Sequence, residues 1–143
     1  MFPVTLNGYH FEDSMLTFNL ASGITASDVG KAVSVDTSAN NTVKLAGDGD
    51  EIIGRLETVE LRTQEGLNVG TVALRFAQLL PIKSGETINV GDGLVGAGSG
   101  EVKAQAATVE LTDSGSDTVD APVAKARCRA WEVRTGFVVA TLI

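Results

Sequence analysis

The sequence predicts an all-β fold: a compact β-barrel or sandwich with two related halves and an N-terminal extension. The 143 residues include 16 glycines, few aromatic residues and many Val and Thr, a composition that favours strands joined by tight turns. Short stretches alternate between apolar and polar residues, and Gly-rich turns separate them. Residues 29–33 are echoed by residues 90–94, and residues 42–46 by residues 101–105, about sixty residues further on.

The composition limits the kind of protein this is. A chain of this length with 43% hydrophobic residues can form one domain with a hydrophobic core. Its formal net charge of −7 argues against a nucleic-acid partner, because phosphate binding needs a basic surface. No apolar run approaches the length of a membrane span, so no membrane partner is expected. Cys128 is the single cysteine, which suits synthesis in a reducing cytoplasm.

Two parts are distinguished along the chain. Residues 1–20 have no echo in the second half and hold four of the seven aromatic residues, so they are either an arm that docks elsewhere or a lid on the core. Residues 21–143 are expected to form a single β domain, which an internal duplication would divide into about 21–80 and 81–143. A further echo of Thr-Val-Glu-Leu, at residues 58–61 and 108–111, conflicts with that spacing.

Residues 82–103 are the stretch around which this prediction is organised. We interpret them as three short strands joined by tight turns at residues 90–93 and 98–100, because Gly and Asp tolerate positive φ. Residues 91–96 also match the dinucleotide-binding pattern G-x-G-x-x-G, but that pattern requires a helix to follow it. The Gly-rich residues 97–100 cannot begin a helix, so a hairpin is predicted and no cofactor is expected.

Two further segments are expected to be strands. Residues 52–62 predict one long strand with a bulge near residues 57–59, where the alternation slips. Residues 70–77 also favour a strand. A helix continuing to Leu80 is the alternative, but β-branched residues lead the segment and Pro81 closes it.

No catalytic arrangement is recognised in the sequence. His10 is the only histidine, and it lies in the N-terminal segment with no evident nucleophile beside it. Cys128 lies between Arg127 and Arg129, which could lower the pKa of its thiol, but strand alternation would turn both arginines to the opposite face. We therefore expect a small buried cysteine and no enzymatic activity.

Two acidic clusters offer oxygen ligands of the kind that calcium prefers. The clusters are Asp48, Asp50 and Glu51, and Asp113, Asp117 and Asp120. Neither has the full ligand spacing of an EF-hand loop, so solvated turns without a metal are expected in both.

One strand face stands out from this background. Residues 124–133 alternate cleanly, which predicts a strand with Lys125, Arg127, Arg129 and Trp131 on one face. Three like charges in a row are destabilising unless acidic groups neutralise them. Trp and Arg are also enriched in interface hot spots. The face is therefore either a subunit interface or an exposed edge whose charges prevent aggregation.

Several of these segments together resemble a known family. They are residues 21–36, Ile-Ile-Gly-Arg-Leu at 52–56, Leu-Pro-Ile at 80–82, Val-Gly-Asp-Gly-Leu at 90–94 and Gly-Glu-Val-Lys at 100–103. The run from residue 21 to residue 143 resembles the capsid decoration proteins, also called head cement proteins, of tailed bacteriophages. The resemblance implies a small β-rich protein that clusters on the outside of the expanded head, commonly as a trimer, and reaches the shell with an N-terminal arm.

The function implied is that of a structural virion protein that binds the outer capsid surface and stabilises it. Its partners would be the major capsid protein and further copies of itself, and it would be made in the host cytoplasm. The residues of the capsid-binding arm would be Phe2, Val4, Leu6, Tyr9 and Phe11. The alternative function is a glycan- or host-binding β module of a virion fibre.

Overall fold

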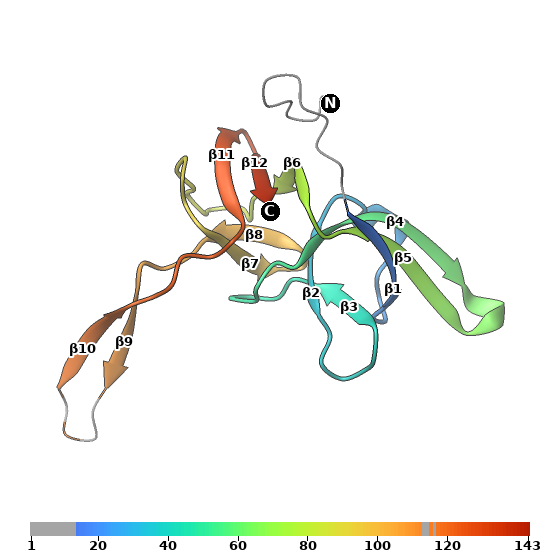
Figure 1. Ribbon diagram of the computed structural model, residues 1–143, viewed down its shortest axis with the longest axis horizontal. Coiled ribbons are helices and arrows are strands. Elements are labelled where there is room, and N and C mark those ends of the chain that lie inside the picture. Colours follow the sequence, from blue (N-terminus) through green and yellow to red (C-terminus); the bar gives the residue numbers. More distant parts are fainter. Residues whose placement is uncertain (1–13, 113–114, 116) are drawn as a thin grey trace.

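The protein is built almost entirely of β-strands. The computed structural model describes residues 14–112, 115 and 117–143, and Figure 1 shows the strands of these residues. The helical elements in this part of the chain are two 3₁₀ turns, η1 (Ala26–Asp28) and η2 (Thr63–Glu65). The predicted all-β fold is confirmed. The arm residues Phe2, Val4, Leu6, Tyr9 and Phe11 lie outside the described residues, as does His10.

The first half of the chain forms a closed five-stranded barrel. Its strands are β1 (Met15–Leu20), β2 (Ala32–Val35), β3 (Thr42–Leu45), β4 (Gly54–Arg62) and β5 (Leu67–Ala73). They lie in the order β1-β3-β2-β4-β5, and β1 closes the ring by pairing antiparallel with β5. Residues 15–20, which the sequence assigns to the arm or lid, are therefore a strand of this barrel.

The second half repeats this arrangement in a more open form, which we call the second barrel. Its strands are β6 (Phe76–Pro81), β7 (Leu94–Gly98), β8 (Glu101–Ala104), β11 (Arg129–Arg134) and β12 (Phe137–Leu142). They form a three-stranded sheet, β11-β12-β6, and a two-stranded sheet, β7-β8. Single β-bridges join Ile82 to Val102 and Gly93 to Arg129, which completes the circular order β6-β8-β7-β11-β12.

Individual hydrogen bonds relate the two barrels position by position. The amide of Gly30 donates to the carbonyl of Leu56 at 2.7 Å, and the amide of Gly91 donates to the carbonyl of Ala130 at 2.8 Å. In both barrels the long hairpin carries a bulge at the same place, immediately after Leu56 in β4 and immediately after Ala130 in β11. The bulge predicted in the long strand is thus confirmed. The structural repeat runs from β1 to β5 and again from β6 to β12.

Each barrel has an apolar core filled from these equivalent positions. Buried residues of the first core with buried counterparts in the second are Val33 with Leu94, Val43 with Val102, Leu56 with Ala130, and Val72 with Ala140. The second core is the larger, because the first barrel also contributes Ala32, Ala46, Ile52 and Ala73 to it. The second core is therefore shared between the barrels, which makes them one folding unit.

The β7–β8 turn docks the second barrel onto the first. Four backbone hydrogen bonds of 2.9–3.1 Å cross this contact, from Ala32 to Gly100, Gly100 to Ala46, Gly49 to Gly96 and Gly96 to Asp50. The backbones approach so closely that a Cβ atom on Gly96 would lie 2.2 Å from the carbonyl oxygen of Gly47. Glycine is thus required at position 96 by packing between the barrels.

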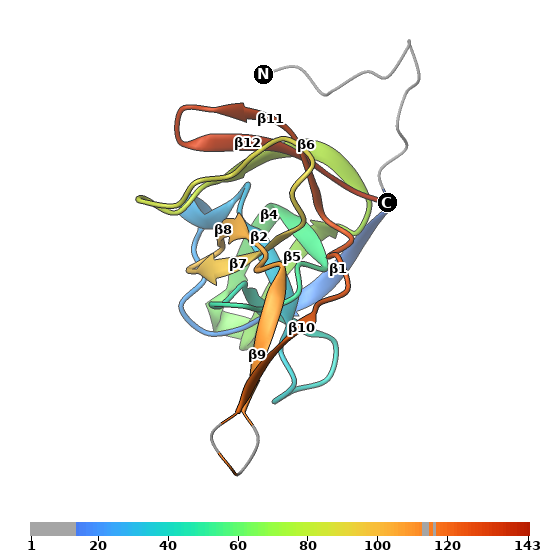
Figure 2. The ribbon, with the colours of Figure 1, turned by 90° about the vertical axis from the view of Figure 1, so that its left-hand side faces the viewer.

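A further hairpin has no counterpart in the first barrel. β9 (Thr108–Thr112) and β10 (Thr118–Pro122) pair antiparallel as a two-stranded sheet of their own. They are inserted between β8 and β11, whereas residues 46–53 alone connect the equivalent strands β3 and β4. Figures 1 and 2 show this hairpin projecting from the barrels, and in Figure 1 it extends away from the tip of the β4–β5 hairpin.

Two strand predictions need correction. Residues 70–77 do not form one strand, because β5 ends at Ala73 and β6 begins at Phe76 in the other barrel. The apolar alternation continues across this junction since both strands point side chains into a core. Residues 83–89 form a loop and not the first of three strands, because Gly85 turns the chain with a φ of 89°.

The strand predicted at residues 124–133 is also shorter than expected. β11 begins at Arg129, and an extended loop precedes it. The side chain of Gln105 holds this loop, because its amide donates to the carbonyl of Ala124 at 3.0 Å and its oxygen accepts from the amide of Ala126 at 2.7 Å. A side chain thus supplies the hydrogen bonds that a neighbouring strand would otherwise provide.

Candidate interaction surface

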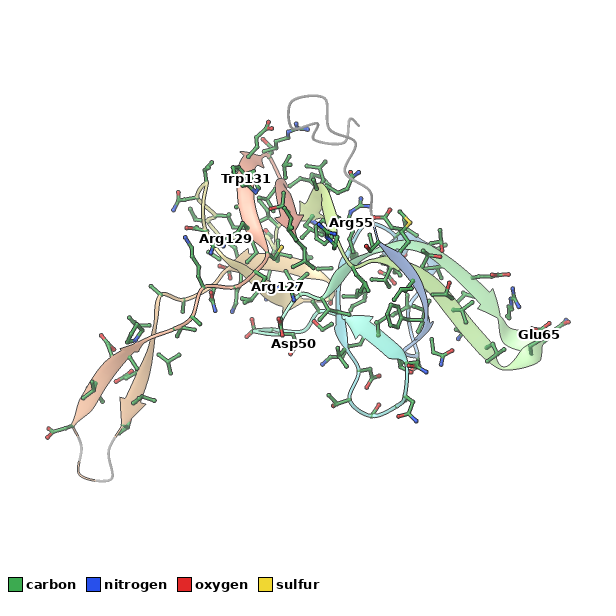
Figure 3. All side chains as sticks on the ribbon, viewed as in Figure 1. Asp50, Arg55, Glu65, Arg127, Arg129 and Trp131 are labelled. Atoms are coloured by element: carbon green, nitrogen blue, oxygen red, sulfur yellow. The ribbon has the colours of Figure 1, made fainter. Side chains whose placement is uncertain are left out.

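The four residues predicted for a subunit interface lie where the inserted hairpin returns to the second barrel. Lys125 and Arg127 are exposed in the loop between β10 and β11, and Arg129 is half-buried at the first position of β11. Trp131 follows at the bulge and is 55% exposed. Figure 3 shows Arg127, Arg129 and Trp131 along this part of the chain.

Local hydrogen bonds orient the last two of these side chains. The Nε of Arg129 donates to the carbonyl of Ala126 at 3.1 Å, and the Nε1 of Trp131 donates to the Oγ1 of Thr141 in β12 at 2.7 Å. The bulge after Ala130 ends the predicted alternation, so that residues 131–134 are all exposed. Trp131 therefore presents an immobilised ring to solvent.

Lys125, Arg127 and Arg129, which we call the basic segment, form no salt bridge with another described residue. Within the described residues, salt bridges hold six of the eleven Lys and Arg side chains, and none of the six belongs to this segment. In a chain of net charge −7, cations left without an ion pair are available to acidic groups of a partner.

Two members of the basic segment line one shallow pocket. Lys125 and Arg127 lie on one side of a cavity of about 310 Å³, and Gly49 and Glu51 from the β3–β4 loop lie on the other. Arg129 and Trp131 do not line it. The structure thus brings Lys125 and Arg127 together and separates them from the other two predicted interface residues.

The β9–β10 hairpin beside this segment has two unlike faces. Directly opposed residues of an antiparallel pair share a face. The pairs Val109–Ala121 and Leu111–Val119 therefore form an apolar face, and Glu110–Asp120 lies on the other. Leu111 is 55% exposed and Val119 is 64% exposed, so the apolar face is uncovered. This hairpin was not predicted, although two alternating runs flank the Gly-containing polar loop at residues 112–117.

The candidate nucleophile Cys128 lies inside the second core. It is 2% exposed, and burial raises the pKa of its thiol to about 12. A thiol with that pKa is protonated at neutral pH and is a poor nucleophile. The prediction of a buried cysteine is confirmed.

Two of the three acidic residues of the β3–β4 loop, Asp48 and Asp50, are paired with lysines. The Oδ1 of Asp48 accepts from Lys103 at 2.6 Å, and this hydrogen bond lowers the pKa of Asp48. The Oδ2 of Asp50 lies 2.9 Å from the Nζ of Lys44, and this contact likewise lowers the pKa of Asp50. Among the described residues no group of His, Cys, Asp and Glu side chains could hold a metal ion.

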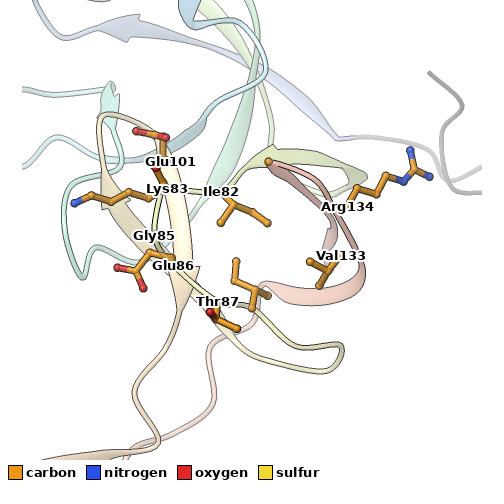
Figure 4. Close-up of a pocket in the computed structure, with 11 residues that line it drawn as sticks. Ile82, Lys83, Gly85, Glu86, Thr87, Glu101, Val133 and Arg134 are labelled. Carbon is orange, nitrogen blue, oxygen red and sulfur yellow. The ribbon is translucent and has the colours of Figure 1, made fainter.

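The largest pocket that we describe is an open cavity of about 510 Å³ between the 82–88 loop and the β11–β12 turn. Figure 4 shows its lining, which carries Lys83, Glu86, Glu101 and Arg134. Lys83 donates to the carbonyl of Ala97, and Arg134 pairs with Glu132. Lys83 and Arg134 are thus engaged by other groups of the protein, and no histidine or cysteine is among the described residues that line the cavity.

No protein-family model and no curated protein matches the sequence of this chain. In the part of the chain that the structure describes, no helix is long and apolar enough to cross a membrane.

Proposed function

We propose that this protein is a decoration protein, which binds the outer surface of a tailed-bacteriophage head and stabilises it. The observation that carries the proposal is a small double barrel from which two hairpins project in different directions (Figure 1). Such a shape suits contact with other proteins, whereas an enzyme would need a cleft with convergent reactive groups. The resemblance of residues 21–143 to head cement proteins supports the same function.

The stabilising effect follows from mass action. A protein that binds the assembled, expanded shell and not its free subunits stabilises the shell by its binding free energy. A head offers many identical sites, so a modest contribution from each adds to a large total. The major capsid protein would be the partner, and the outer surface of the virion the location.

A contact with the capsid would involve the leading segment and β1. β1 pairs with β3 only at Asn19 and Leu20, so residues 15–18 have one edge without a partner strand among the described residues. Free strand edges accept an added strand from another protein. The apolar residues of the leading segment, Phe2, Val4, Leu6, Tyr9 and Phe11, would continue this contact along a shell subunit.

The test mixes purified protein with undecorated heads of the phage that encodes it. We expect the protein to co-sediment with the heads and to raise the temperature at which they break. Absence of co-sedimentation, or no change in that temperature, refutes the proposal. Deletion of residues 1–13 tests the arm separately, because deletion to residue 20 would also remove β1 from the barrel.

The alternative function is a glycan- or host-binding module, and the exposed ring of Trp131 is the observation that favours it. Exposed aromatic rings can stack on sugars. Binding to a panel of host glycans that is lost in Trp131→Ala, without binding to heads, would establish this alternative.

A further inference from the structure

The inserted β9–β10 hairpin lacks the cover that an amphipathic hairpin normally has. An isolated two-stranded sheet is marginally stable in water, and an exposed apolar strand surface invites association. Here Val109, Leu111 and Val119 form such a surface on a sheet that has no third strand among the described residues. The hairpin thus has the properties of an element whose apolar face is covered by a binding partner.

The opposite face of the hairpin is acidic. Glu110 and Asp120 stand directly across from each other, and like charges in this arrangement destabilise a hairpin. Neither carboxylate forms a salt bridge with another described residue. A pair of cations against this face would remove the repulsion.

The basic segment supplies cations of that kind. Lys125 and Arg127 follow β10 after a short extended stretch, while the hairpin projects away from the barrels in both views. Glu110 and Asp120 are complementary in number and sign to Lys125 and Arg127, and none of the four forms a salt bridge with another described residue. A second copy of the chain therefore carries groups of the right charge for such a contact.

We propose that copies of this protein assemble through the inserted hairpin. The hairpins of the copies meet through their apolar faces at the symmetry axis. The outward acidic face of each, Glu110 and Asp120, lies against Lys125 and Arg127 of a neighbouring copy. The acidic face of each copy's hairpin contacts one neighbour, and the Lys125 and Arg127 of that copy contact the hairpin of another copy. Repetition of this contact closes a ring. This inference rests on the proposed function, because it identifies the surface through which copies of a decoration protein bind one another.

The test measures molar mass in solution, with no heads present, by light scattering and sedimentation equilibrium. We expect the wild-type protein to form an oligomer. Val109→Ser, Leu111→Ser and Val119→Ser combined should weaken association about tenfold or more, because they remove the apolar contact. The matched control is Leu61→Ser with Leu67→Ser, which removes exposed leucines from the β4–β5 hairpin and should leave the mass unchanged.

Charge reversal tests the second part of the contact. Glu110→Lys with Asp120→Lys, and separately Lys125→Glu with Arg127→Glu, should each weaken association. All four changes in one chain should restore it, because the signs are exchanged and the pairing is kept. All of these residues are exposed, so melting curves should confirm that the variants fold.

A wild-type protein that is monomeric at every concentration overturns the inference, as does an unchanged mass in the triple serine variant. Failure of the four-fold exchange to restore association overturns the charge contact. If the protein is monomeric but still binds heads, and the serine variant loses head binding, the hairpin contacts the capsid instead. The proposed function then stands while this inference falls.

Discussion

The Nε of Arg55 in β4 donates a 2.9 Å hydrogen bond to the carbonyl oxygen of Leu79 in β6 and so ties the first barrel to the second. The same guanidinium forms a 2.7 Å ion pair with Glu57, and both side chains are largely buried. Arg55→Ala leaves two buried acceptors without this donor, so we expect the free energy of unfolding to fall by about 2 kcal/mol. Urea denaturation measures the change.

Arg62→Ala is the matched control for that substitution. Arg62 also pairs with carboxylates, those of Glu60 and Glu65, but these ion pairs are exposed to solvent. The expected loss is much smaller than that for Arg55→Ala, because solvent screens these ion pairs. Equal losses for the two variants would contradict the role given to Arg55.

Replacement of Gly96 should disrupt the contact between the barrels. Gly96→Ala places a methyl group 2.2 Å from the carbonyl oxygen of Gly47, so the backbones must separate. We expect a loss of about 3 kcal/mol, the upper range for overpacking. Gly115→Ala, where a Cβ meets no atom within 4 Å, is the control and should change the melting temperature little. A melting temperature of Gly96→Ala close to that of the wild type would show that the barrels are not so closely docked.

Acid should destabilise the protein partly through Asp28. Burial tends to raise the pKa of this carboxyl, but hydrogen bonds from Lys31 and the amide of Thr25 outweigh burial and hold the pKa below its usual 3.8. Because the folded-state pKa is the lower one, the carboxylate contributes stability above about pH 4, and this contribution is lost as the pH falls through the folded-state pKa.

Melting temperatures of wild type and Asp28→Asn between about pH 6 and about pH 3 check this prediction. The variant should be less stable than wild type at the higher pH, and the difference should shrink as the pH falls. A constant difference over this range would mean that the charge of Asp28 contributes nothing to stability.

The thiol of Cys128 should be unreactive in the folded protein. Burial keeps reagents in solution away from the thiol. It also raises the pKa of the thiol to about 12, so that almost no reactive thiolate is present at neutral pH. An aromatic disulfide reagent at about pH 8 should therefore label the native protein only at the rate of unfolding, and should label it fully in urea. Val119→Cys adds an exposed thiol that should react at once, which controls for the reagent. Immediate reaction of native Cys128 would contradict its burial.

Features that depend on local chemistry are the ones that the sequence predicts well. The bulge after Leu56 is visible because the alternation slips there, and the β7–β8 turn because Gly and Ser occupy positions of positive φ. The burial of Cys128 follows from its small apolar neighbours at alternate positions. Each of these depends on a few consecutive residues, so no knowledge of distant parts of the chain is needed.

The full alignment of the two barrels could not be predicted. The equivalent hairpins β4–β5 and β11–β12 share pairing and bulge but few residue types, because the fold requires only that inward positions be apolar. The inserted hairpin also changes the spacing between equivalent residues. The Thr-Val-Glu-Leu echo is misleading, since residues 58–61 lie in β4 and residues 108–111 lie in the insertion.

The candidate surface could be predicted in part. Alternation at residues 124–133 identifies side chains that leave the core, but it cannot distinguish a strand from an extended loop held by Gln105. Nor does it reveal that the basic segment forms no ion pair with another described residue. Four of the six paired cations find carboxylates within three residues along the chain, but the carboxylates of the other two depend on the fold. Two of those carboxylates, Asp48 and Asp50, come from the β3–β4 loop.

The covalent connection between the two barrels consists of Leu74 and Arg75, the residues between β5 and β6. A link this short holds the barrels at an effective concentration of about millimolar or more, because neither can diffuse away. Barrels produced as separate chains would have to find each other at their dilute concentration in the cell. The fusion thus removes the dependence on protein concentration from the first step of assembly. Concentration then governs only the association of complete chains.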